Sequence, residues 1–275
     1  MSRLSPIAIA VFCALPLGAA PAAKSQIAII GTLHGRHAKS PGYTYSTLYS
    51  LIRCLKPDYV GVEMRQEDLP RPRAYLEANY PKEMIELASE WNARAFGFDW
   101  LGDDVANAPI PADWWSKKSP IKKMERALDG DLRFKDPLLD AISAREEAIL
   151  ADATPEKLND SRYDDFNDAY YARLAYLLAG SPYEALPEFY ARRDYRLALN
   201  VAAFARRHEG SRIVVATGAD HRSALVRLLG RWFGDSLRIV PVEECSGSAG
   251  DSPKSRPEAA PAPGKSALRG HGARE

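Results

Sequence analysis

The chain has 275 residues, of which 46% are apolar, enough for one substantial core or a core with a helical annex. Its 37 Lys and Arg nearly balance 36 Asp and Glu, so the overall charge gives no reason to expect nucleic acid or an anionic membrane as a partner. Past the N-terminal segment, no run of about 20 apolar residues predicts a membrane span in the mature chain.

The N-terminus has the pattern of a signal peptide. Arg3 gives a short positive region, residues 7–17 are apolar, and small residues at 20–23 offer a cleavage site. We therefore predict a cleaved signal peptide over 1–23 and a periplasmic or secreted protein; the alternative is an uncleaved N-terminal anchor. Cys13 does not indicate a lipoprotein, because Phe12 precedes it where a small residue is required.

The C-terminal residues 246–275 are rich in Ser, Pro, Ala, Gly and charge and lack apolar periodicity, which predicts a disordered tail. One α/β domain is expected over 25–245. Cleavage of the leader would leave Cys54 and Cys245, which in an oxidising compartment could form a disulfide or remain two buried thiols.

Strands and helices alternate over the first hundred residues. Short apolar runs predict buried strands at 27–30, 59–62 and 95–98, and apolar residues at helical spacing predict helices over 43–56 and 83–92. Strand, helix, strand, helix, strand is the pattern of a parallel sheet with right-handed crossovers.

The segment 101–187 differs in character. Prolines separate amphipathic stretches such as 138–151 and 165–179, which predicts an all-helical insertion over or beside the sheet. The aromatic residues in it could line a pocket, but helix packing is the expectation for most of them: Trp114, Trp115, Tyr163, Tyr170, Tyr171, Tyr176 and Tyr183.

After the insertion the alternation returns. A long helix is predicted over about 184–207, a strand over 212–217, a helix over 221–232 and a last strand over 237–242. The fold class we predict is therefore α/β: a mostly parallel central sheet of about five strands with flanking helices and a helical insertion.

Four of the predicted strands end in polar residues: His34, Glu63, Asp99 and His221. The two histidines each close a strand–GxxH unit, in GTLH and GADH. One GxxH would arise by chance roughly a third of the time in a chain with this many Gly and His, but two copies that both follow apolar strands are a stronger signal. Because open α/β sheets build sites at the carboxyl ends of their strands, we expect these side chains to share one sheet edge.

Two imidazoles and a carboxylate allow two chemistries. A His₂Glu set with an open position suits Zn²⁺, Mn²⁺ or Co²⁺, which would lower the pKa of a bound water. Alternatively, one histidine oriented by Glu63 could act as a metal-free general base. His37 could lie behind the site residues or simply be exposed, and exposure is the expectation. Arg192 and Arg193, on the helix before the GADH strand, could bind a substrate anion or make a structural ion pair.

The motifs GTLH, PDYVGVE, AFGFDW, RRDYRLA and VVATGADHRSALVRLL, in this order, resemble the TraB/PrgY/GumN/Tiki superfamily and its wider relatives, the erythromycin esterases and ChaN-type haem-binding lipoproteins. His34, Glu63, the pair Arg193-Asp194 and His221 match the family's motif positions. The resemblance covers about 26–100 and 188–242.

The sequence departs from the pattern in two places. Trp100 follows Asp99 where an Arg is common, and Arg192 stands where TraB-like proteins often have Glu. The resemblance implies either a metal-dependent hydrolase like the Tiki proteases or a metal-free esterase.

The sequence thus predicts an exported hydrolase of a small-molecule or peptide substrate, cleaving a peptide or ester bond with a divalent metal (Mn, Zn or Co). His34, Glu63 and His221 are the expected catalytic residues and ligands, Asp99 is a further candidate ligand, and Arg193 would orient the substrate or the site. The alternative is a periplasmic haem- or metal-binding protein without turnover, in which Tyr and His could be axial haem ligands. An inactive interaction domain ranks last.

Overall fold

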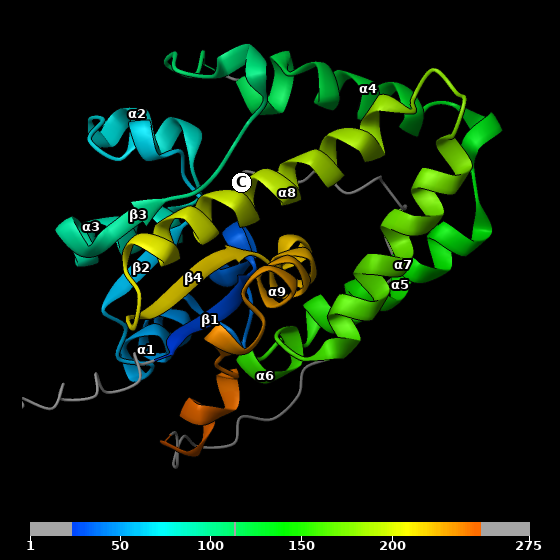
Figure 1. The fold of residues 1–275 in the computed structure, drawn as a ribbon. Coiled ribbons are helices and arrows are strands. Elements are labelled where there is room, and N and C mark those ends of the chain that lie inside the picture. The colour runs from blue at the N-terminus through cyan, green and yellow to red at the C-terminus, as the bar shows by residue number, and fades with distance from the viewer. Residues whose placement is uncertain (1–23, 113, 249–275) are drawn as a thin grey trace, which may run out of the picture.

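A computed structural model describes residues 24–112 and 114–248. It contains a five-stranded, all-parallel sheet with helices on both faces, as the sequence predicts (Figure 1). The strand order is β3-β2-β4-β1-β5. The strands are β1 (Ser25–Thr32), β2 (Tyr59–Val62), β3 (Ala95–Gly97), β4 (Arg212–Gly218) and β5 (Leu237–Ile239). The predicted signal peptide and almost all of the predicted tail lie outside the described residues.

The period of two along β1 divides the core into two layers. Ala28 and Ile30 face one apolar cluster, which includes residues of α1 (Tyr45–Cys54) and α3 (Lys82–Trp91). Ile27 and Ile29 face the other, under α8 (Ala185–Arg207) and α9 (Ala219–Phe233). A parallel sheet covered on both faces needs apolar side chains on both sides of each strand, which is why these runs are continuously hydrophobic.

Between β3 and α8 the described residues form helices and turns, without a strand. In Figure 1 these helices extend from one side of the sheet, with α5 and α7 side by side and α8 running from them back across the sheet. They are α4 (Pro120–Asp129), α5 (Pro137–Ala151), α6 (Pro155–Leu158) and α7 (Ser161–Leu178), with a π-helical segment at Trp114–Lys118. Helix α2 (Arg73–Asn79) has no counterpart among the predicted elements.

Most of the aromatic residues of this segment pack, as expected. Tyr163 and Tyr170 are buried, whereas Tyr176 is exposed.

Among the described residues no helix has both the length and the apolar character that crossing a membrane requires.

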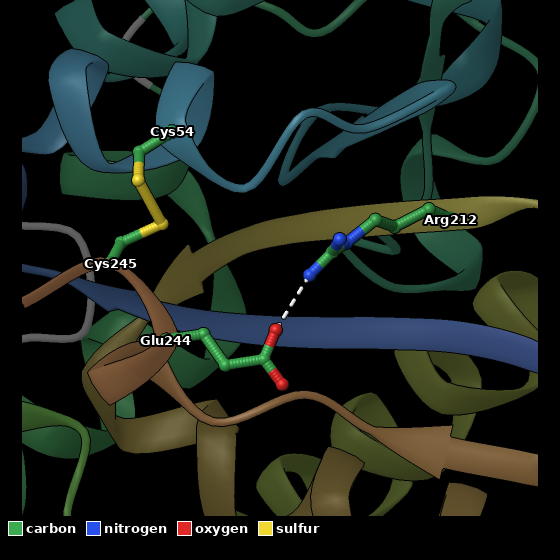
Figure 2. The surroundings of a disulfide bond; sticks show 4 residues. All are labelled: Cys54, Arg212, Glu244 and Cys245. Atoms are coloured by element: carbon green, nitrogen blue, oxygen red, sulfur yellow. Dashed lines mark hydrogen bonds and ion pairs between the residues drawn. A yellow bond between two sulfur atoms is a disulfide. The ribbon is translucent and has the colours of Figure 1, made fainter.

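A disulfide joins Cys54, at the end of α1, to Cys245, and their Cα atoms are 5.9 Å apart (Figure 2). It connects positions 191 residues apart, and of the two alternatives left by the sequence the structure therefore has the disulfide. Beside it Glu244 accepts a hydrogen bond from Arg212 at 2.8 Å, so the segment after β5 is held both to α1 and to the start of β4.

Candidate functional site

Glu63 lies at the carboxyl edge of the sheet, among the polar side chains that follow the strands. It follows β2 directly, and register places it beside Thr217 of β4. Its Oε2 accepts hydrogen bonds from Thr217 Oγ1 at 2.8 Å and from the backbone N–H of Gly218 at 2.6 Å, and its Oε1 accepts one from Arg193 Nη2 at 2.8 Å. Burial alone would raise the pKa of Glu63, but the charges of His221, Arg193 and His34 and the Gly218 amide lower it strongly. Glu63 is therefore a fixed anion.

Arg193 occupies the middle of the same cluster, on the face of α8 turned to the sheet. Its Nη2 donates to Glu63 and, at 2.9 Å, to Asp99 Oδ1, and its Nε donates to Asp99 at 3.2 Å. Its Nη1 lies 3.1 Å from His221 Nε2, and Trp115 lies beside the guanidinium. With 4% of its surface exposed, Arg193 is committed to these partners, which favours a role in orienting the site.

His221 lies in the first turn of α9 and is also buried. Its Nδ1 is 2.6 Å from Asp194 Oδ1, and its Nε2 is 3.6 Å from Glu63 Oε1. Burial lowers the pKa of His221, whereas the charges of Glu63 and Asp194 raise it, and the balance lies above the usual value. We call Glu63, Asp99, Arg193 and His221 the charge cluster; the structure brings these four predicted residues together.

His34 stands at the rim of the charge cluster, beyond the end of β1. Its backbone is left-handed, with φ of 50°, and 21% of its side chain is exposed. Its Nδ1–H donates to Glu83 Oε1 at 2.8 Å. Its Nε2 points at Gly218, where a Cβ atom would lie only 2.6 Å from it. Burial lowers the pKa of His34, but the hydrogen bond and charge of Glu83, with the charge of Glu63, raise it to about 9.

Sequence reasoning missed Glu83, the partner of His34. It lies in the first turn of α3 with 0% of its surface exposed, and its Oε1 also accepts a hydrogen bond from Thr32 Oγ1 at 3.3 Å. A signal was present: Glu83 stands four residues before Leu87, on the apolar face predicted for this helix. A charged residue on a buried face needs a partner.

The prediction that His37 is exposed is wrong. Its exposed fraction is 1%, because the 3-10 turn after β1 folds it back under the chain. Its Nε2 accepts a hydrogen bond from the backbone N–H of Leu33 at 2.9 Å, and its Nδ1–H donates to the carbonyl oxygen of Tyr43 at 2.6 Å. Burial lowers the pKa of His37, which fits the neutral form that these two bonds require.

Arg192, by contrast, makes an ion pair, as in the second of its two predicted roles, but at the surface. Its Nη2 lies 2.6 Å from Asp103, and both side chains are more than half exposed.

The residues expected to bind a metal do not fit one in this arrangement. The Arg193 guanidinium donates to Glu63 and contacts His221 Nε2, so it stands where an ion bridging those two groups would stand. Both oxygens of Glu63 already accept hydrogen bonds. Within the described part of the chain, no three or more His, Cys, Asp and Glu side chains are arranged to hold a metal ion.

The fold and the site thus define an α/β protein with a buried charge cluster and a carboxylate-paired histidine at the carboxyl edge of a parallel sheet. Comparison with protein-family models, with curated proteins and with solved structures finds no match to this chain.

Proposed function

We propose that the protein is an exported hydrolase that cleaves a carboxylic ester with His34 as general base and without a metal. The observation that carries the proposal is the His34–Glu83 pair. A buried carboxylate holds Nδ1–H of a partly exposed imidazole, which leaves Nε2 free to take a proton at the sheet edge.

In the proposed reaction, Nε2 of His34 accepts a proton from water as the water oxygen attacks the ester carbonyl carbon. The resulting imidazolium is stabilised by Glu83 on one side and by the charge of Glu63 on the other. When the tetrahedral intermediate collapses, the C–O bond to the alcohol breaks and the proton on Nε2 passes to the leaving oxygen. The products are the carboxylic acid and the alcohol.

The charge cluster supports this chemistry without exchanging protons with substrate. Glu63 has too low a pKa to act as the base and serves as a fixed negative charge. Arg193 holds Glu63 and Asp99 in place, and His221 is held in turn by Asp194. Export is supported by the N-terminal pattern and by the disulfide, since disulfides persist in oxidising compartments.

The proposal is tested with 4-nitrophenyl acetate and the mature protein, from about residue 24, before and after chelation. We expect turnover that chelation leaves unchanged and that His34→Ala lowers by about 10²–10⁴-fold, the usual contribution of a general base. His208→Ala is the matched control, because His208 stacks on Phe204 and contacts the ring of Tyr59, at the opposite end of β2 from Glu63.

Turnover that disappears on chelation and returns with Mn, Zn or Co would favour the metal-dependent hydrolase predicted from the sequence. A Soret band on haem titration, in a protein without turnover, would favour the haem-binding alternative.

A further inference from the structure

His34 is held in a backbone conformation that residues other than glycine seldom adopt. A left-handed φ of 50° brings the Cβ of an L-residue close to the following carbonyl oxygen, so such a conformation persists only where surrounding contacts enforce it. The direction of the imidazole depends on this conformation, because the chain reverses at this residue between β1 and the 3-10 turn over His34–Ala38.

Two of the hydrogen bonds that hold the turn involve His37, beside a bond from the Tyr45 hydroxyl to the His34 carbonyl oxygen at 3.4 Å. The backbone N–H of Leu33, the residue immediately before His34, donates to His37 Nε2, and His37 Nδ1–H donates to the Tyr43 carbonyl. The His37 ring also packs edge-on against the Tyr43 ring, with centroids 4.8 Å apart, and against Tyr45 at 5.2 Å. One buried side chain therefore ties the residue before His34 to the segment that leads into α1.

We propose that His37 is the positioning residue that fixes the left-handed turn and thereby aims His34 Nε2 at the sheet edge. Without the bond from Leu33 N–H to His37, the turn has lost the buried contact that holds the residue immediately before His34. His34 then rotates away from Glu83 and from Gly218. His37 does not touch the reacting atoms and acts only through His34.

The test compares two substitutions at one position. His37→Gln keeps an acceptor for Leu33 and a donor for Tyr43 in one amide group, whereas His37→Leu keeps volume and loses both. Each variant is made in the full mature protein, and the pKa of His34 is measured by NMR titration of its imidazole. His208→Leu is the control for replacing by leucine another histidine that packs against aromatic rings.

For His37→Leu we expect the His34 titration to move down from about pH 9, because the contact with Glu83 is lost, and kcat for 4-nitrophenyl acetate to fall by roughly 10²-fold with KM little changed. His37→Gln should keep most of the wild-type kcat and a His34 titration close to that of the wild type. An unchanged His34 titration in His37→Leu, or equal losses in the two variants, would overturn the inference.

The kinetic arm rests on the proposed function, but the NMR arm does not. If the wild-type protein hydrolyses no ester, the proposed function fails while the titration of His34 still decides the positioning role. If His37→Leu does not fold, His37→Ala, which also removes both bonds, takes its place: a lowered His34 titration supports the role and an unchanged one contradicts it.

Discussion

The pairing of His34 with Glu83 leads to the sharpest prediction. In Glu83→Gln the imidazole loses its charged partner, and Glu63 is then the charge that opposes burial and Arg193, which both lower the pKa of His34. The pKa of His34 should therefore fall from about 9 to its ordinary value of 6.5 or below. That difference corresponds to about 3 kcal/mol at 1.36 kcal/mol per pKa unit.

The same shift predicts how stability depends on pH. A folded-state pKa above the unfolded value means that the contribution of His34 to the free energy of unfolding is complete below pH 6.5 and is lost as pH rises through 9. Between these limits the wild-type protein should therefore lose up to about 3 kcal/mol from this group. Glu83→Gln should have a lower free energy of unfolding near neutral pH, and that free energy should fall less than in the wild type as pH rises to 9.

Two assays measure these quantities: NMR titration of the imidazole, with the His34 signal assigned from a His34→Asn variant, and urea denaturation at pH values from 6 to 9.5. Glu86→Gln is the control, because Glu86 lies one turn along α3 in a surface ion pair with Arg73. A wild-type His34 that titrates near 6.5, or a Glu83→Gln protein that keeps a value near 9, would refute the reasoning.

Three further outcomes follow from the same structure. Arg193→Ala should lower the free energy of unfolding by about 3–5 kcal/mol, because the substitution leaves two buried carboxylates without their cation. The neighbouring Arg192→Ala is the control and should change the free energy of unfolding by no more than about 0.5 kcal/mol. Denaturation of both variants measures the difference. Gly218→Ala should reduce kcat/KM by roughly 10²-fold with little change in Tm, because the new Cβ meets His34 Nε2 while the backbone at Gly218 has an ordinary φ of −53°. Reduction of the disulfide should lower the free energy of unfolding by about 5 kcal/mol on the chain-entropy account for so long a loop, and equal Tm values with and without dithiothreitol would contradict this.

Much of the fold could be predicted because the apolar pattern of each segment agrees with the place of that segment in the core. The apolar strands end in the polar residues that the structure gathers at one edge, so Glu63, Asp99 and His221 were found from strand endings alone. Arg193 was found by its place on the helix before the second GxxH, although its two partners come from strands that no sequence spacing relates to it.

The contacts that reach across the chain could not be predicted in the same way. Glu83 is 49 residues from His34, and only its place on a buried helix face distinguishes it from an exposed acid. His37 looked like an ordinary loop residue because its burial depends on a turn with a left-handed residue, which composition does not reveal.

The central claim is that His34 is the base of a metal-free esterase, and the pH dependence of kcat/KM tests it most directly. The measurement uses chelator-treated mature protein and 4-nitrophenyl acetate, with His34→Asn as the reference for uncatalysed hydrolysis. Because only the neutral imidazole accepts a proton, the enzymatic rate should rise with pH to half its maximum near pH 9 and be absent in His34→Asn. A rate that is lost on chelation, or a His34→Asn protein with the wild-type profile, would contradict the account.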